Sequence, residues 1–508
     1  MATDKLETER KYEADAGTVL PDLTGLPGVA GISSPQEFRL EADYFDTAGL
    51  RLLQAGITLR RRRGGSDAGW HLKLPAGPDS RRELQLPLGR GSVVPAELSR
   101  LVRAQARGAR LTPVATIITV RRQRELLDDS GASLAEVVDD AVSAHTLGEQ
   151  TEATQWREIE VELTGGGRKL LQAADYQLRA AGLQRAASSA KLHRVLASRL
   201  PEPGTGPAGA AALTRKSTAG EVVLAYLRAQ AGVLTAADPA VRRDEPGSVH
   251  DMRVASRRLR SVLQTFTPVL PADATARLTD ELKWLGQVLG EARDGEVLQE
   301  HLRELAEQLP AELVLGPVQA TMTEHLSPRH GTARRALLRA LDSRRYLTLL
   351  GELDGLLADP PLTDVAARPA DALLQPVAKS WRRLRRRVRQ AGSLPAGADR
   401  DTALHEARKA AKRARYAAEV LVPVTGKPGR QFVRQMKQVQ GVLGDHQDTV
   451  MARAAIRDLG LRAHRSGDNA FTFGVLYERD AQAGRDLQRA AGRTWQRAAK
   501  KKYRRWLT

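Results

Sequence analysis

The first residues of the chain that could do chemistry are Glu7, Glu9 and Lys11, in the stretch LETERKY. Alternate residues of a β-strand point to the same side, so a strand here would place two carboxylates and an ammonium on one face. An exposed strand often carries such a pattern without any function. The same pattern would also suit a polar tunnel that holds a metal ion and a phosphate. The spacing alone leaves both interpretations open.

Other strand-length segments before residue 200 separate charge in the same way. The residues that share a polar face in them are Arg60 and Arg62, His71 and Lys73, and Glu158, Glu160 and Glu162. In the second and third of these segments, apolar residues occupy the opposite face. One group of strands therefore supplies carboxylates and another supplies Arg and Lys. A phosphate chain chelated by a divalent metal requires both, because carboxylate oxygens hold Mg²⁺ or Mn²⁺ and the cations bind phosphate oxygens.

About eight such segments precede residue 200, with turns rich in Gly and Pro between them. They read LETERKY, RLEADYFDT, GITLRRR, GWHLKLP, RELQLPL, ATIITVRRQREL, LAEVVDDAVSAH and REIEVEL. This pattern predicts a closed antiparallel barrel or sheet. Two helical stretches, around Pro95–Gly108 and Lys169–Ala181, are expected to flank it.

These motifs resemble the CYTH family, the triphosphate tunnel metalloenzymes, over residues 1–200. The family opens on E-x-E-x-K, which Glu7, Glu9 and Lys11 match, and the segments YFDT, LRRR, HLKLP, TVRR, EVVDD, EIEVE and SAKL are similar too. The resemblance implies an eight-stranded antiparallel tunnel barrel that uses Mg²⁺ or Mn²⁺. Family members include inorganic triphosphatases, thiamine triphosphatases and class IV adenylyl cyclases.

The same resemblance implies roles for individual residues. Glu7, Glu9 and Lys11 are the expected catalytic residues. The expected metal ligands are Glu7, Glu9, Glu158, Glu160 and either or both of Asp139 and Asp140. The expected triphosphate-binding residues are Lys11, Arg60, Arg62, Lys73, Lys191 and either or both of Arg121 and Arg122. The sequence does not fix the strand phase that would decide within each adjacent pair.

The chain changes character after residues 200–220, a stretch rich in Pro, Gly and Ala that we interpret as a linker. We expect one domain at 1–199 and a second at 221–505. In the second, long segments rich in Ala, Leu and Arg place apolar residues three and four apart, which predicts an all-α helical bundle.

The helical part contains an internal repeat. VHDMRVASRRLR from Val249 matches LHEARKAAKRAR from Leu404, and LKWLGQVLGEARD from Leu282 matches MKQVQGVLGDHQD from Met436. Two motifs that recur in the same order predict two similar helical units, at about 221–365 and 366–505.

The repeated polar residues fall on one face of each predicted helix. His250, Arg253, Arg257 and Arg260 span an arc of about 80°. His405, Arg408, Lys412 and Arg415 repeat this arrangement. Two such stripes would form a basic groove suited to a row of phosphates, although a single stripe would more often be a solvated face. The candidate phosphate-chain ligands are His250, Arg253, Arg257, Arg260, Lys283, His405, Arg408, Lys412, Arg415, Lys437 and His446.

The repeat resembles the CHAD domain, the conserved-histidine α-helical domain, over residues 215–505. Both H-x-x-R-x-x-x-[RK]-R motifs and both LG-x-x-x-D motifs match. Family members are associated with inorganic polyphosphate. His446 of the second unit stands where the first has Ala292, so the two halves are not equivalent.

Composition limits the remaining possibilities. The absence of cysteine excludes disulfides and thiol catalysis. Residues 1–200 contain 28 Lys and Arg against 26 Asp and Glu, and the rest of the chain contains 51 against 34, which points to a polyanionic partner for the second part. With no apolar run long enough for a membrane span or signal peptide, we expect a cytoplasmic protein, associated with polyphosphate granules.

These observations favour a metal-dependent hydrolase of inorganic triphosphate that also binds polyphosphate. The alternatives are a non-catalytic polyphosphate-binding protein, a thiamine triphosphatase and a nucleotidyl cyclase, for which Trp70 is the main aromatic candidate. Nucleic acid is a less favoured partner, because the basic run KKKYRRW has no base-reading motif beside it.

Overall fold

The computed structural model describes residues 3–15, 17–77, 79–89, 91–148, 150–186, 188, 190–200 and 213–507. The chain divides into two compact units, Met1–Glu202 and Pro203–Thr508. Most of the predicted linker lies outside the described residues. Its last residues belong to a helix that begins at Ala219, because Thr218 and Glu221 form a capping box there.

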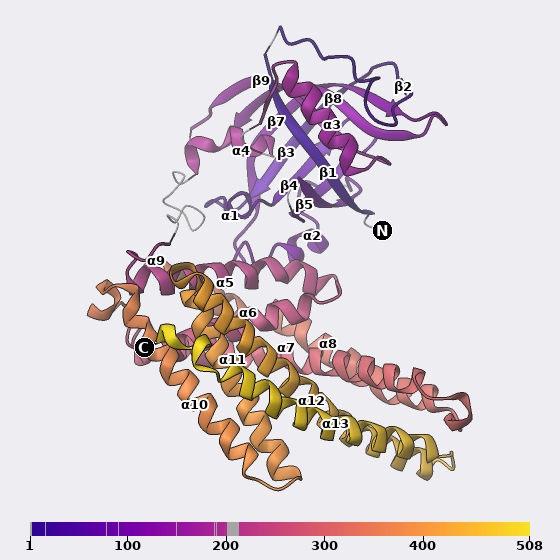
Figure 1. Ribbon diagram of the computed structural model, residues 1–508. Helices are drawn as coiled ribbons and strands as arrows, with labels where there is room; N and C mark the ends of the chain where they lie inside the picture. Colours follow the sequence, from indigo (N-terminus) through magenta and orange to yellow (C-terminus); the bar gives the residue numbers. More distant parts are fainter. Residues whose placement is uncertain are drawn as a thin grey trace. The chain divides into compact units, whose positions relative to one another are not determined.

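Eight long strands of the N-terminal unit close into an antiparallel barrel (Figure 1). Their order is β1-β6-β5-β4-β3-β7-β8-β9, and β9 pairs back with β1. The bounds are β1 Thr3–Ala14, β3 Gln36–Asp46, β4 Thr58–Arg63, β5 Gly69–Pro75, β6 Ser80–Leu86, β7 Thr112–Leu127, β8 Ser133–Thr146 and β9 Ala153–Leu163. Short strands β2, Gly31–Ile32, and β10, Gln184–Arg185, pair with β7 and β1. The predicted eight-stranded barrel is confirmed.

The apolar cores of this unit lie outside the barrel, because the strands turn their apolar faces outward. The helices that cover them are α1 Arg51–Gln54, α2 Ala96–Leu101, α3 Arg168–Ala180 and α4 Lys191–Val195, followed by the 3₁₀ turn η1 Ala197–Arg199. Tyr12 and Ile159, for example, pack with Leu171 of α3. α2 is shorter than the predicted helix, and turns lead from it to Gly108. This arrangement leaves the polar strand faces to line the interior.

The C-terminal unit is helical, as predicted, and is built from two similar halves (Figure 1). The first contains α5 Ala219–Arg242, α6 Ser248–Thr265, α7 Ala272–Glu307, η2 Ala311–Leu313, α8 Val318–Asp342, α9 Arg344–Ala358, η3 Asp364–Ala367 and η4 Ala370–Leu373. The second contains α10 Leu374–Gly392, α11 Ala398–Thr425, α12 Lys427–Arg465, α13 Phe471–Ala498, η5 Lys501–Tyr503 and η6 Arg505–Leu507.

The repeated motifs occupy equivalent helices of the two halves. The histidine–arginine motifs lie on α6 and α11, which pack against each other. The Leu-Gly motifs lie on α7 and α12, which also pack together. Within the described parts of the chain, none of the helices has the length and apolar character that crossing a bilayer requires.

Candidate active site

The barrel interior is a polar cavity of about 290 Å³. Alternate residues of the surrounding strands point into it. The charged residues that line it include Glu7, Glu9 and Lys11 of β1, Arg60 and Arg62 of β4, Lys73 of β5, Glu83 of β6, Arg121 of β7, Glu160 and Glu162 of β9, and Lys191 of α4. The carboxylates and cations predicted from separate strands therefore meet in one cavity.

Three buried carboxylates form a compact group in this region. Asp140 and Glu158 lie opposite each other in the pairing of β8 with β9, and Glu160 follows two residues later. Each offers an oxygen within 4.8 Å of the others. The Nζ atom of Lys191 lies 2.9 Å from Asp140, 2.6 Å from Glu158 and 2.5 Å from Glu160. One ammonium thus compensates part of the charge of three carboxylates.

The electrostatics of this group favour charged side chains despite burial. Burial alone would raise the pKa of Glu160, but Lys11, Lys191 and Arg121 outweigh it and hold that pKa well below its usual range. The pKa of Asp140 is lowered in the same way by Lys191 and Arg121. In return, these carboxylates raise the pKa of Lys191 well above normal, against the effect of burial. The site is therefore an assembly of ionised groups.

A second group of charges lines the cavity around Glu83. His71 Nδ1 lies 2.8 Å from a Glu83 oxygen, Lys73 Nζ lies 3.8 Å from it, and Lys73 also pairs with Glu7. Arg60 approaches Glu83 at 3.9 Å. Burial, helped by a hydrogen bond with Glu83, raises the pKa of Glu7 to about 8. Burial lowers the pKa of His71 to about 4.

Sequence reasoning missed Glu83 as a site residue. The pairing of β5 with β6 sets Lys73 directly opposite Glu83, so both must point to the same side of the sheet. The signal was present in the sequence, since Lys73 was already assigned to the interior. Finding Glu83 required the register across the β5–β6 turn.

The strand register decides between the adjacent residues left open above. Arg121 points inward and donates to both oxygens of Asp140, at 2.8 and 2.7 Å. Arg122 points outward, is 67% exposed and pairs with Glu37. Asp140 is fully buried, whereas Asp139 faces outward and pairs with Arg157 at 2.8 Å. The inclusion of Arg122 and Asp139 among the site residues was therefore wrong, because neighbours in a strand face opposite sides.

This pair of arginines gives a matched test of the site. Replacement of Arg121 by Gln is expected to lower phosphate release from tripolyphosphate at least about tenfold, because its guanidinium lines the cavity and holds Asp140. Replacement of Arg122 by Gln removes the same charge from the outer face and is expected to leave turnover unchanged. Steady-state kinetics of both variants makes the comparison, and equal losses would contradict the inward assignment of Arg121.

The carboxylate group has the chemistry that a hard divalent cation requires. Mg²⁺ and Mn²⁺ prefer carboxylate oxygens, and Asp140, Glu158 and Glu160 offer them within one small volume. Glu7 and Glu9 also line the cavity, but they are not part of this compact group. Glu9 is instead held beside Lys11, at 3.2 Å. The buried cluster could therefore hold a metal ion, with Glu7 and Glu9 outside its compact core.

The basic stripes of the C-terminal unit meet where α6 packs against α11. Arg253 pairs with Asp294 at 2.7 Å, and Arg408 lies 4.0 Å from Asp448, the equivalent residue of the second half. Burial together with Arg257, Arg408 and Arg253 lowers the pKa of Lys412 to about 6. Arg253, Arg257, Arg408 and Lys412 are hereafter called the central cluster. They carry more positive charge than the nearby carboxylates balance.

The glycines of the Leu-Gly motifs have a structural role beside this cluster. A side chain at Gly290 would meet the guanidinium of Arg253 at 3.3 Å, and one at Gly444 would meet Arg408 at the same distance. The absence of a side chain on α7 and α12 lets each arginine lie flat against the next helix. The repeated spacing of His, Arg and Leu-Gly therefore encodes this contact.

Other predicted residues of the stripes do not belong to the central cluster. Arg415 pairs with Glu419 at 3.1 Å, and Lys283 and Lys437 are exposed. His250 is exposed, and His405 Nδ1 lies 2.7 Å from Gln447 Oε1.

The prediction that His446 faces the phosphate chain was wrong. Its imidazole is 1% exposed and lies 3.0 Å from Gln488 and 3.2 Å from Asp401. The packing of α12 against α13 encloses it, which spacing along one helix could not show.

Comparison with known proteins agrees with this arrangement. The CYTH domain family matches residues 5–192 and the CHAD domain family matches residues 225–457. An uncharacterized protein found in two strains of Mycobacterium tuberculosis is 37% identical over 491 residues, which cover 94% of this chain and 93% of the relative.

Two solved structures are each similar to about half of this chain. PptA from Streptomyces chartreusis has a TM-score of 0.48 and 23% identity, covering 55% of this chain and 100% of its own. The CHAD domain of the plant Ricinus communis has a TM-score of 0.44 and 26% identity, covering 55% and 95%. With a CYTH barrel followed by a CHAD bundle, the chain belongs to the family of CYTH–CHAD domain proteins.

Proposed function

We propose that the barrel hydrolyses a linear triphosphate with the help of a divalent metal ion, and that tripolyphosphate is the preferred substrate. The observation that carries this proposal is the cavity, where Glu160, which forms a compact group with Asp140 and Glu158, lies among inward-facing cations. Carboxylates alone would suit any metal site, and cations alone would suit any anion. Both together suit a phosphate chain bound with its metal.

Within this proposal Asp140, Glu158 and Glu160 would hold Mg²⁺ or Mn²⁺, which when bound neutralises phosphate charge and polarises a phosphoryl oxygen. Arg60 and Lys73, which belong to the group of charges around Glu83, bind phosphate oxygens. Arg62, Lys11, Arg121 and Lys191 add to the positive charge of the cavity. Glu7 and Glu9 position the attacking water from β1.

A nucleotide is less well supported as the substrate. Trp70, the aromatic residue considered for stacking on a base, is 1% exposed and packs against Phe45 with ring centres 5.0 Å apart. It belongs to the core outside the barrel, so it offers no face to a ligand in the cavity. This favours substrates recognised through phosphates alone.

The helical unit is proposed to bind longer polyphosphate at the central cluster. The pKa of Lys412 is lowered by burial and by neighbouring arginines, whose unfavourable field a bound anion would relieve. Arginine suits this role because its guanidinium binds two phosphate oxygens at once. Such binding would retain the enzyme at cytoplasmic polyphosphate granules.

The deciding experiment measures phosphate release by the intact chain from tripolyphosphate, ATP and thiamine triphosphate, with Mg²⁺, with Mn²⁺ and with chelator. Metal-dependent release that is fastest with tripolyphosphate is expected. Pyrophosphate released from ATP together with a cyclic nucleotide would instead establish a cyclase. Polyphosphate binding without turnover of any substrate would make the protein a binding protein and refute the proposed hydrolysis.

The Leu-Gly contact gives a test of the central cluster. Gly444→Ala is expected to stabilise α12 by about 0.5–1 kcal/mol, since glycine is a poor helix former, and to weaken polyphosphate binding several-fold by displacing Arg408. Gly441 lies on the same helix, and a side chain there would meet no neighbour within 4 Å. Gly441→Ala should therefore stabilise α12 without weakening polyphosphate binding. Thermal unfolding and binding titration measure both effects. If Gly444→Ala binds polyphosphate as tightly as the unaltered protein, Arg408 does not contact the ligand.

A further inference from the structure

The first helix of the second half, α10, carries a basic surface that the central cluster does not use. Its sequence LQPVAKSWRRLRRRVRQAG has no Asp or Glu. The exposed arginines Arg382, Arg385, Arg386 and Arg389 fall within an arc of about 100° and extend for about 10 Å. Buried residues such as Trp381 and Leu384 occupy the opposite side. These four arginines are called the α10 face below.

The charge of the α10 face is not compensated by the protein. Over the ranges that the structure describes, neither these four arginines nor Arg383 has a carboxylate partner. The corresponding helix of the first half differs, since Arg228 of α5 donates to the carbonyl oxygen of Leu357 and Arg242 pairs with Asp238. The unbalanced charge is therefore a property of the second half and not of the repeat.

Three arginines connect this surface with the helices of the central cluster. Arg260 of α6, Arg413 of α11 and Arg383 of α10 come from adjacent helices. Burial, with Arg383 and Arg260 nearby, lowers the pKa of Arg413. Arg413 donates to Gln264 at 2.9 Å. This group, the bridging arginines, lies where α6, α11 and α10 pack together.

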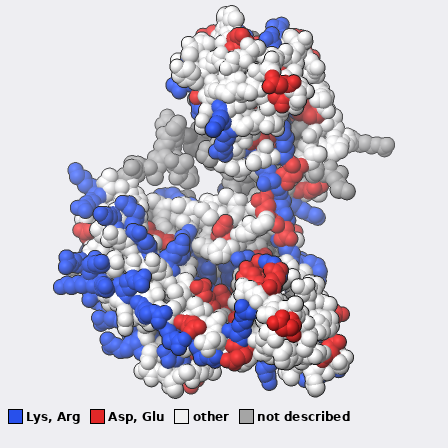
Figure 2. Space-filling model, turned by 45° about the vertical axis from the view of Figure 1, so that its right-hand side comes forward, with Lys and Arg blue, Asp and Glu red and all other residues white. Residues whose placement is uncertain are grey.

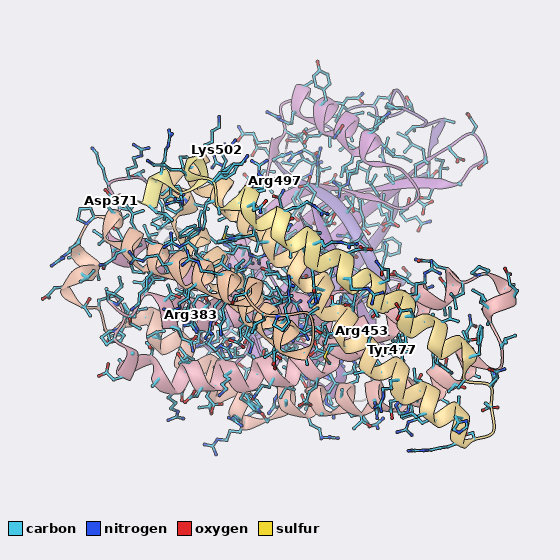
Figure 3. All side chains as sticks on the ribbon, turned by 60° about the horizontal axis from the view of Figure 1, so that its bottom comes forward. Asp371, Arg383, Arg453, Tyr477, Arg497 and Lys502 are labelled. Atoms are coloured by element: carbon cyan, nitrogen blue, oxygen red, sulfur yellow. The ribbon has the colours of Figure 1, made fainter. Side chains whose placement is uncertain are left out.

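The C-terminal residues add to the same surface. Trp381 of α10 stacks on Trp495 of α13 with ring centres 6.1 Å apart, and the guanidinium of Arg504 lies 5.0 Å from the ring of Trp381. This contact holds the run KKKYRRW beside α10, with Lys500–Lys502 exposed. Figure 2 shows Lys and Arg gathered on the left of the C-terminal unit, and Figure 3 marks Arg383 and Lys502.

We propose that the bridging arginines and the α10 face continue the polyphosphate-binding site beyond the central cluster, so that the helical unit selects long chains over short ones. The inference rests on the proposed binding of polyphosphate at the central cluster. A linear polyanion with evenly spaced charge can follow arginines from α11 onto α10 without any base-specific contact. Each added guanidinium stabilises the longer chain only.

The aromatic residues argue against single-stranded nucleic acid as the occupant. Recognition of single strands uses aromatic faces on which bases stack. Trp381 is 5% exposed, and its ring is covered by Trp495, Arg504 and Arg385, whose guanidinium lies 5.3 Å away. Trp381 therefore offers no open face for a base to stack on, which fits a polyphosphate chain bound by guanidinium and ammonium groups.

The test replaces all four arginines of the α10 face by Gln in the intact chain. Binding of a short and a long size-fractionated polyphosphate is titrated in the presence of chelator, with RNA as a further probe. The affinity for the long chain is expected to fall about tenfold or more, with a shallower dependence on salt. The affinity for the short chain is expected to stay unchanged, because the central cluster is intact.

A charge-matched control replaces Arg277, Arg303, Arg345 and Arg462 by Gln. These arginines are exposed on other helices and each pairs with a carboxylate, so the control loses the same net charge and is expected to keep long-chain affinity. The inference would be overturned if both variants lost long-chain affinity equally, or if the α10 variant lost none. It would also be overturned if the α10 variant lost affinity for RNA and kept its affinity for polyphosphate. Failure of the unaltered protein to bind the short chain would instead refute the proposed function.

Discussion

Replacement of Asp140 by Asn is expected to reduce metal-dependent phosphate release by about a hundredfold or more, while Asp139→Asn leaves it nearly unchanged. The two residues are adjacent in β8, and the substitutions are chemically identical. Asp140 is fully buried and accepts two hydrogen bonds from Arg121. Asp139 contacts Arg157 on the outside of the barrel. Only the orientation of the side chain differs.

The physical reason is the compact carboxylate group. Asn at position 140 removes one of the three oxygen anions that lie within 4.8 Å of one another, and the amide is a poorer ligand for a hard cation. Lys191 and Arg121 remain and would balance the negative charge of the two carboxylates that are left. The substitution should therefore weaken metal binding itself, and the loss of hydrolysis should follow from that weaker binding.

The measurement combines turnover with a readout that does not need catalysis. Thermal unfolding with increasing Mn²⁺ reports metal binding, because a ligand of the folded state raises the melting temperature. The Asp139→Asn variant should show the same rise as the unaltered protein, and Asp140→Asn a much smaller one. A similar rise in both variants would place the metal elsewhere. Comparison of the metal-free melting temperatures separates this effect from loss of folding, since breaking a buried ion pair is itself destabilising.

The sequence was sufficient to predict the barrel because its signal is local. The alternation of charged and apolar residues in segments such as GWHLKLP and REIEVEL predicts both that a strand forms and that its two faces meet different surroundings. The alternation does not show which face lines the inside of the closed barrel. Charged faces turned to solvent would give the same pattern, and the distinction depends on the helices α1–α4 that cover the apolar side.

Prediction failed where two segments distant in sequence decide the outcome. The choice between Arg121 and Arg122 depends on the pairing of β7 with β3 and β8. Glu83 depends on its register with Lys73. His446 lies on the same helix as Gly444, but contacts with Asp401 of α11 and Gln488 of α13 bury it. Helical spacing identifies residues on one face, and tertiary packing decides whether that face is open.

The affinity for polyphosphate is expected to fall as the pH rises through neutrality, because Lys412 must take up a proton to bind it. The pKa of Lys412 in the free protein is about 6, lowered by burial and by Arg257, Arg408 and Arg253, with Asp448 acting weakly in the opposite direction. At pH 7.5 its amine is therefore largely neutral. A bound phosphate chain restores the favourable field and raises this pKa towards the usual value for lysine, near 10.4.

The sign and size of the effect follow from linkage. Between the free and the bound pKa, binding takes up about one proton, so each pH unit lowers the affinity up to about tenfold. Titration of the ligand acts the other way, since terminal phosphate groups gain charge as the pH rises through about 6. Burial lowers the pKa of His250 and of His405, so both imidazoles are harder to protonate than an ordinary histidine.

Binding measured by calorimetry from about pH 6.5 to 8.5, in buffers of different ionisation enthalpy, gives both the slope and the number of protons taken up. Lys412→Arg should bind with little dependence on pH, because guanidinium stays charged throughout. Lys412→Met should also lose the slope but bind more weakly at pH 6.5. A slope that persists in both variants would assign the proton to another group. An unaltered protein whose affinity does not change with pH would show that the ligand leaves Lys412 uncharged, and therefore that the chain does not reach the seam between α6 and α11.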